Sequence, residues 1–220
     1  NWNKARALDS KRVGPEIDYL GVWQILAPLA LWLRETNPQA GLVTKRQLYA
    51  FLRDYFQETE GYPPSEAGQR TREFIDSVYR YSSLLIERGH QQYGFIHQTL
   101  EEYLAGCGLT LLPEAEALAK IREHLLDPEW RETILLGIGA LGLVNRKARE
   151  AGLLTRRLLE TDLDGEHRGL NVVVAGEALR DMGRVGLGRE AEAEITAALR
   201  ETMRDPAVTL RLRREAGLLL

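Results

Sequence analysis

The stretch YGFIHQTLEEYLA, residues 93–105, joins a strand-like segment to a helix-like one. Aromatic residues alternate with others as far as His97, and apolar residues at helical spacing follow. Thr99 and Glu102 have the spacing of a capping box, in which each side chain bonds the other residue's backbone N–H. The pattern predicts that His97 ends a short strand, two residues before a capped helix start.

The segments before this stretch predict three helices. Residues 17–36 are apolar on nearly all sides, as in a helix buried against several partners, and Pro28 marks either a kink or a helix start. Thr44 and Gln47 form a second capping box that opens the next helix. A loop is expected over Glu60–Ser65, followed by a helix over 71–81.

A β-hairpin follows the third helix. Leu84–Ile86 and the alternating residues up to His97 predict its two strands, and Gly89-His90 predicts its turn. Three helices followed by a hairpin is the order of a winged helix. We therefore predict this subfold.

The remainder of the chain is helical, with a period of about 40 residues that is typical of HEAT-like helix pairs. Turn-like dipeptides recur at separations of 37 and 41 residues: Asp127-Pro128, Asp164-Gly165 and Asp205-Pro206. Three glycines recur with a similar period, and we expect them to let neighbouring helices approach closely: Gly137, Gly176 and Gly217. The predicted units are 114–142, 145–183 and 188–220.

The predicted fold class is mainly α, a winged-helix subdomain with a small β-hairpin followed by HEAT-like α-α repeats. The predicted divisions are a lead-in segment at 1–16, a winged helix at 17–112 and helical repeats at 113–220. The sequence starts without Met and stops within a helical pattern, so we expect a fragment of a longer protein that is truncated at its C-terminus.

Composition excludes several classes of protein. The net charge is −3, and the first 110 residues hold 12 basic against 13 acidic side chains, which argues against binding to nucleic acid. One cysteine favours a reducing, cytoplasmic setting. No apolar run approaches the ~18 residues of a membrane span, so we expect no membrane partner.

Catalytic and metal-binding patterns are missing from the sequence. It has no glycine-rich phosphate loop with Lys and Ser/Thr, and we interpret Gly183–Gly188 as a loop between helices. The four histidines are scattered, and Cys107 is interpreted as a core residue. Glu101 and Glu102 point about 100° apart on a helix, so we discount an acid–base pair. We predict no catalytic residue, no metal site and no enzyme activity in this chain.

The motif aromatic-x-His-x-Thr-Leu-x-Glu-Tyr-x-Ala at residues 95–105, with ILAPLALWL at 25–33, resembles bacterial NACHT-type STAND NTPases. The resemblance covers about 17–110 and departs at Leu100, where the family more often has an aromatic residue. It implies that this sequence is the C-terminal part of such a protein, a winged helix plus HEAT-like repeats. The intact parent would be an ATPase that binds ATP or ADP with Mg, forms an oligomer when activated and serves signalling or antiviral defence.

The resemblance also gives His97 a role. In the family the matching histidine contacts the β-phosphate of ADP, so His97 is the candidate cofactor-binding residue, with the nucleotide supplied by a missing N-terminal nucleotide-binding domain. Such a contact requires a ring that is open toward that domain. The alternative is a histidine that hydrogen-bonds nearby backbone and fixes the strand–helix corner.

We therefore predict a regulatory and sensor fragment of a NACHT-type signalling ATPase. The winged helix would stabilise the ADP-bound resting state, and the helical repeats would sense or relay a protein trigger. A first alternative is a free-standing helical-repeat module for protein–protein interaction. A second is a DNA-binding winged-helix regulator that uses Arg70, Arg72 and Arg80, although Glu73 and Asp76 lie among them.

Overall fold

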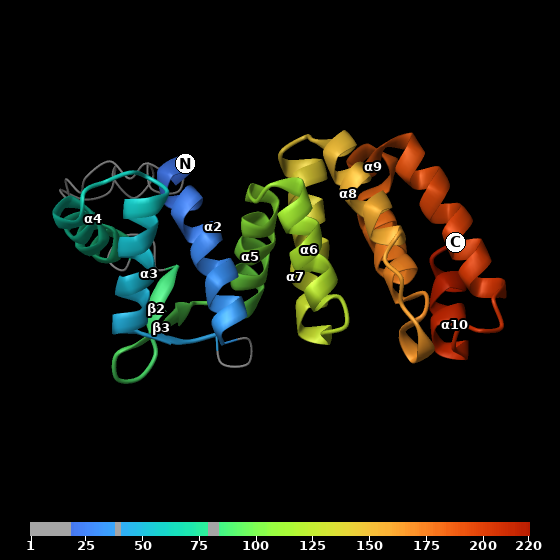
Figure 1. Ribbon diagram of the computed structural model, residues 1–220, viewed down its shortest axis with the longest axis horizontal. Coiled ribbons are helices and arrows are strands. Elements are labelled where there is room, and N and C mark those ends of the chain that lie inside the picture. The colour runs from blue at the N-terminus through green and yellow to red at the C-terminus, as the bar shows by residue number, and fades with distance from the viewer. Residues whose placement is uncertain (1–18, 38–40, 79–83) are drawn as a thin grey trace, which may run out of the picture.

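The computed structural model describes residues 19–37, 41–78 and 84–220, so the predicted lead-in segment at 1–16 lies outside the described residues. A helix-and-sheet subdomain lies at one end of an elongated molecule, and a row of helices extends from it (Figure 1). The predicted mainly α class is confirmed. The first subdomain contains α2 (Tyr19–Thr36), β1 (Val43–Thr44), α3 (Lys45–Glu58), α4 (Pro64–Ser77), β2 (Leu85–Glu87), β3 (Gln92–Phe95) and α5 (Gln98–Leu111).

The predicted hairpin is present as β2 and β3, and it carries a third strand that the sequence did not predict. The strand order is β1-β3-β2, and both pairings are antiparallel. Val43 pairs with Tyr93 on one side of β3, and Leu85 pairs with Phe95 on the other. A two-residue strand such as β1 carries too little periodicity to be recognised before folding.

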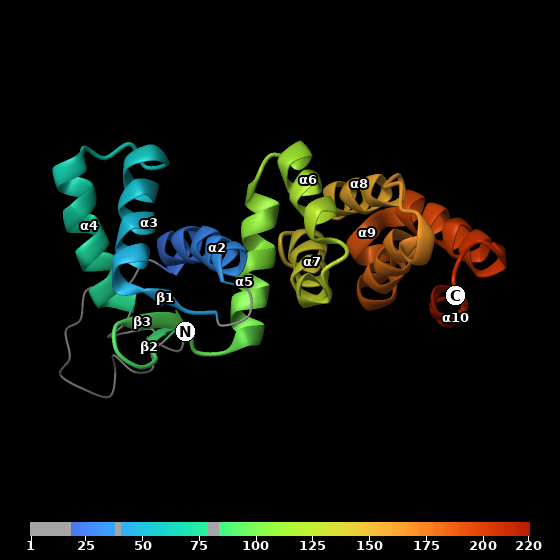
Figure 2. The ribbon, with the colours of Figure 1, turned by 60° about the horizontal axis from the view of Figure 1, so that its bottom comes forward.

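Helix α2 lies between α3 and α5 (Figures 1 and 2). It continues through Pro28, so the predicted alternative of a helix start at this residue is wrong. Because proline has no N–H, the carbonyl of Gln24 lacks its usual helical donor. The hydroxyl of Tyr55 on α3 donates a hydrogen bond to that carbonyl at 3.2 Å. This side chain therefore satisfies the backbone group that the proline leaves open.

The predicted capping box at the start of α3 is confirmed. The Thr44 hydroxyl accepts a hydrogen bond from the N–H of Gln47 at 3.3 Å, and the Gln47 side chain accepts from the N–H of Thr44 at 2.9 Å. Helix α4 begins at Pro64, so the loop predicted over Glu60–Ser65 is shorter than expected. Proline suits the first turn of a helix, where its missing N–H would have no partner. The predicted helix over 71–81 extends partly beyond the described residues.

The second half of the chain is a succession of antiparallel helices. Each predicted unit contains two helical segments, since α9 breaks where Gly183 and Gly188 have φ of +59° and +80°. The predicted inter-helix loop over these residues is thereby borne out. The elements are α6 (Glu114–His124), η2 (Pro128–Trp130), α7 (Arg131–Gly139), the π-helical η3 (Ala140–Val144), α8 (Ala148–Leu159), η4 (Gly165–His167), α9 (Leu170–Arg204) and α10 (Leu210–Leu218).

The glycines differ in how closely they bring helices together. Gly137 meets the backbone of Gly106, because a Cβ on Gly137 would lie 2.7 Å from the Gly106 carbonyl oxygen. On the opposite side of α5, a Cβ on Gly108 would lie 2.5 Å from the carbonyl oxygen of Ala27. Helix α5 therefore makes backbone-close contact with both α7 and α2.

The predicted close approach holds for Gly137 and Gly176, because a Cβ on Gly176 would lie 2.9 Å from Cδ2 of Leu199, whereas the nearest atom to a Cβ on Gly217 lies 3.3 Å away. Gly176 faces the side chains of Leu199 and Leu219, and Gly217 faces the side chain of Met203, so neither lies against another helix's backbone.

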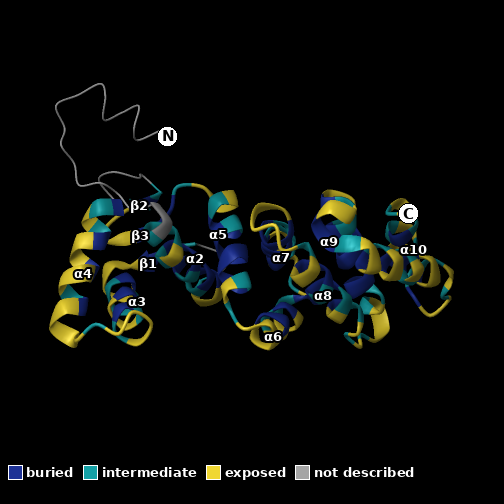
Figure 3. Ribbon diagram, turned by 90° about the horizontal axis from the view of Figure 1, so that it is seen from above, coloured by how far each residue is buried: buried dark blue, intermediate teal, exposed yellow. Residues whose placement is uncertain are grey.

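A continuous hydrophobic core runs from Leu26 to Ala216. Buried residues line the inward faces of the helices along the whole row (Figure 3). Helix α5 packs against α2 on one side and against α7 on the other. The predicted boundary at 112/113 therefore lies inside one continuously packed structure. Movement of α5 would be transmitted to both halves of the chain.

Candidate functional site at the start of α5

The start of α5 differs from the predicted capped start. Helix α5 begins at Gln98 with His97 as its N-cap residue, and no side-chain hydrogen bond caps it. The predicted Thr99–Glu102 capping box is wrong, since Thr99 is exposed within the first turn and the Glu102 side chain is buried. The Glu102 carboxylate instead lies 3.4 Å from the guanidinium of Arg34, with which it forms a buried ion pair.

The backbone corner that holds His97 is fixed by other residues. Arg88 on the hairpin donates hydrogen bonds to the carbonyls of Ile96 at 2.7 Å and Phe95 at 3.3 Å. The N–H of Ile96 donates to the carbonyl of Leu84 at 3.0 Å. These bonds set the direction of the chain immediately before α5 without using the imidazole.

The His97 side chain is exposed. It makes no hydrogen bond or ion pair with any residue in the described parts of the chain. The alternative in which this ring hydrogen-bonds nearby backbone to fix the corner is therefore not what the described residues show. The imidazole is open to an external partner.

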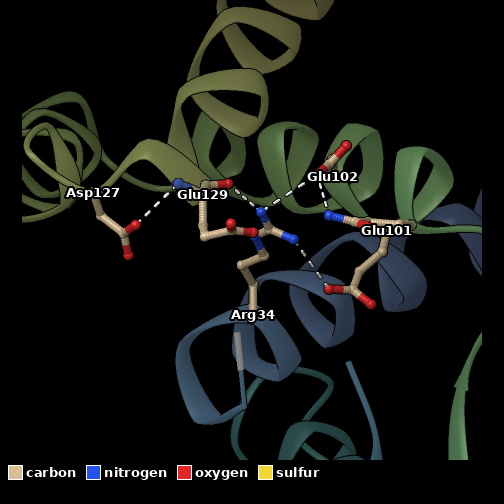
Figure 4. A network of polar contacts seen from close by, with 6 residues as sticks. Arg34, Glu101, Glu102, Asp127 and Glu129 are labelled. Atoms are coloured by element: carbon tan, nitrogen blue, oxygen red, sulfur yellow. Dashed lines mark hydrogen bonds and ion pairs between the residues drawn. The ribbon is translucent and has the colours of Figure 1, made fainter. Parts of the chain in front are cut away.

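Behind this corner lies a buried polar network centred on Arg34, in the last turn of α2 (Figure 4). The Arg34 side chain is only 1% exposed. Its Nη2 atom lies 3.4 Å from Glu102 Oε1 and also donates a hydrogen bond to the carbonyl of Glu129 in η2. Gln98 donates to the same Glu102 oxygen at 3.0 Å. A single guanidinium thus connects α2, α5 and the connection between α6 and α7.

Glu101 is the second carboxylate of this network. Its Oε1 lies 3.6 Å from Arg34 Nη1, and a Cβ on Gly41 would lie 2.8 Å from its Oε2. Burial raises the pKa of Glu101, while the positive charge of Arg34 opposes this effect and the charge of Glu102 adds to it. The two glutamates share one buried cation.

The carbonyl that Arg34 contacts is held in place by the turn before it. Asp127 accepts a hydrogen bond from the N–H of Glu129 at 2.9 Å, which confirms the turn predicted at Asp127-Pro128. A second ion pair, between Glu35 and Lys120, also joins α2 to α6. Two polar links therefore fasten the first subdomain to the helical row.

Arg34 is the residue that the sequence did not single out. It follows a long apolar run and has the position of a solvated charge at a helix end. Nothing in its local pattern shows that α5 and η2 cover it. The sequence did contain one signal for a buried cation. Glu101 and Glu102 are adjacent on a helix predicted to be buried, and two buried carboxylates require a cation nearby.

Other predicted sites have structural explanations. Cys107 is buried among Ala27, Ala140 and Trp23, and burial raises its pKa to about 11, so it is a core residue. Among residues 19–37, 41–78 and 84–220, no His, Cys, Asp and Glu side chains cluster to hold a metal ion. No helix in these ranges is long and apolar enough to span a bilayer.

The two arginines within α4 each contact a neighbouring side chain. Arg70 stacks over Tyr62 and pairs with Glu66 at 3.8 Å, and Arg72 donates to the hydroxyl of Tyr49 at 3.2 Å. Arg80 lies outside the described residues.

Residues 1–109 match the model of a family described as the winged helix-turn-helix domain C-terminal to NACHT. Neither the curated proteins nor the solved structures contain a match to this chain.

Proposed function

Because residues 1–109 belong to the family of winged helix-turn-helix domains that lie C-terminal to NACHT, we propose that this chain is a regulatory and sensor part of a NACHT-type signalling ATPase. Its winged helix stabilises the ADP-bound resting state, and its helical repeats sense or relay a trigger in signalling or antiviral defence. ATP or ADP with Mg binds to the nucleotide domain of the intact parent, which forms an oligomer in the cytoplasm when activated.

The observation that carries this proposal is the exposed imidazole of His97, which has no polar partner among the described residues and lies on a corner that other residues hold. An imidazole N–H that donates to a phosphate oxygen makes a charge-assisted hydrogen bond, with a net contribution of about 1.5–3 kcal/mol. Allosteric couplings are of similar size, about 1–3 kcal/mol. One contact of this kind, present with ADP and lost with ATP, is enough to bias a closed-to-open equilibrium.

The packing of α5 supports a relay from this contact to the repeats. His97 caps the helix whose Gly106 lies directly against Gly137 of α7. Arg34 joins the same helix to Glu129 at the start of α7. A displacement of His97 is therefore carried as a rigid-body movement into the helical row, and a trigger on the row acts back on the nucleotide contact.

Calorimetric titration of ADP tests the proposal on a protein that includes the nucleotide domain. His97→Ala is expected to weaken ADP affinity about 10- to 100-fold, because it removes the charge-assisted bond. His97→Gln, which retains an N–H donor, is expected to recover part of this loss. The control is His90→Ala, at the exposed tip of the hairpin, with unchanged affinity. Equal ADP affinities for His97→Ala and the unaltered protein would refute the sensing role.

A further inference from the structure

Two connecting segments of the helical row, 143–149 and 184–189, meet at one edge of the molecule. A Cβ on Gly142 would lie 2.2 Å from the carbonyl oxygen of Gly186, and a Cβ on Gly186 would lie 3.1 Å from Cδ2 of Leu143. These distances place the loop after Gly183 directly on the end of η3. The two segments form one continuous surface, which we call the 143/185 surface.

The centre of the 143/185 surface is apolar and open to solvent. The exposed fractions are 43% for Leu143, 64% for Val144 and 81% for Val185. Single exposed aliphatic residues are ordinary, whereas three on adjoining segments can together mark an interaction site.

Basic side chains are concentrated on the two segments of the 143/185 surface, next to acidic residues such as Glu150 and Glu190. The two segments contain five basic side chains and no acidic one, although the whole chain has a net charge of −3: Arg146, Lys147, Arg149, Arg184 and Arg189. Ion pairs with acidic residues outside the two segments engage Lys147 and Arg184. The other three arginines are exposed and make no ion pair with any residue that the structure describes.

Arg146 occupies a backbone position that favours glycine. Its φ is +57°, and the N–H of Lys147 donates a hydrogen bond to the carbonyl of Leu141, six residues earlier, at 3.1 Å, at the end of the π-helical η3. A side chain at that position carries a conformational cost that glycine avoids. The requirements of the fold therefore do not explain an arginine here, whereas a role for its charge does.

We propose that the 143/185 surface binds an acidic peptide segment of a partner protein, in which aliphatic side chains alternate with carboxylates. The aliphatic side chains would cover Val144 and Val185, and the carboxylates would pair with Arg146, Arg149 and Arg189. The patch offers no aromatic ring on which a nucleic-acid base could stack. Its exposed apolar residues lie at the end of the short η3 and in the break of α9, and they do not form the long apolar helix face of a membrane-bound segment. The inference deepens the proposed function and rests on it for the role of the repeats as the receiving part.

Fluorescence polarisation of this chain with a labelled peptide of repeated Asp-Leu-Glu units tests the surface. Val185→Asp is expected to weaken binding about tenfold, through lost apolar contact and charge repulsion. Arg146→Gly is expected to weaken it about threefold, the effect of one exposed ion pair, without lowering the melting temperature. Gln91→Gly is the matched control, since Gln91 also has positive φ but lies on the hairpin, and its binding is expected to stay unchanged.

Three further probes identify the class of partner: a peptide with Ser in place of Leu, phosphatidylserine vesicles, and single-stranded DNA. Tight binding by the Leu-containing peptide alone supports the proposal. Wild-type affinity in both Val185→Asp and Arg146→Gly would overturn it, as would stronger binding of vesicles or DNA than of the peptide. Peptide binding is expected to be unaffected by His97→Ala, so a failure at this surface is distinguishable from a failure of the nucleotide role.

Discussion

Arg34→Met removes the buried cation and retains a flexible apolar side chain of similar length. Glu101 and Glu102 then remain buried without their counter-charge. Breaking a buried ion pair by removing one partner costs about 3–5 kcal/mol. For a chain of 220 residues this corresponds to a decrease in melting temperature of about 10 °C.

The pH dependence of this loss distinguishes a charge effect from a packing effect. Burial already raises the folded-state pKa of Glu101, and removing Arg34 takes away its main opposing influence, so this pKa rises further. A raised folded pKa means that the folded state binds more protons, so stability is greatest at low pH and falls as pH rises through the folded pKa. The deficit of Arg34→Met is therefore expected to be smaller near pH 4.5 than at pH 8.

Urea denaturation at several pH values measures both the size and the pH trend of the effect. The matched control is Arg156→Met, which removes an exposed arginine paired with Glu190 and Glu194 and is expected to cost less than about 1 kcal/mol. A deficit of Arg34→Met that is no larger than the control's, or that stays constant with pH, contradicts the argument.

Three further experiments test the fold. Gly137→Ala is expected to destabilise the chain by about 1–3 kcal/mol through overpacking against α5. The control is Gly139→Ala in the same helix, which is expected to be neutral or stabilising because the new Cβ would meet only Met182 Sδ, at 3.6 Å. Melting temperatures of the two variants measure the difference. Thr44→Ala is expected to lower the free energy of unfolding by about 1 kcal/mol, because it removes the cap of α3. An equal loss in Thr99→Ala would contradict the conclusion that Thr99 does not cap α5. Because burial raises the pKa of Cys107 to about 11, its reaction with a disulfide reagent at pH 8 is expected to be slow until urea unfolds the chain, and rapid labelling of the folded protein would refute this burial.

The elements with strong local signals were predictable from the sequence. The Thr44 capping box, the hairpin and the break at Gly183–Gly188 each depend on residues that are close together in the chain. The failed Thr99–Glu102 capping box shows the limit of such reasoning. Its spacing was correct, yet Arg34, which is 68 positions away from Glu102, took the carboxylate instead.

The candidate site was predictable only in part, for the same reason. The position of His97 on a strand–helix corner follows from local pattern, but the bonds that fix this corner come from Arg88 and Leu84 across the hairpin. Likewise, the period of the glycines correctly indicated repeated helices, while only Gly137 meets another helix's backbone, that of Gly106. Which side of a helix faces a neighbouring backbone is decided by the assembled packing.

The shared packing of α5 has a practical consequence for anyone who wishes to exchange the helical repeats between related proteins. A junction placed at the family match's end, residue 109, would separate the Gly106–Gly137 contact and deprive Arg34 of the Glu129 carbonyl. A graft made after η3, at the turn near Arg146, would keep both contacts with the donor of the winged helix. The natural unit of exchange is thus the winged helix together with its first helical pair.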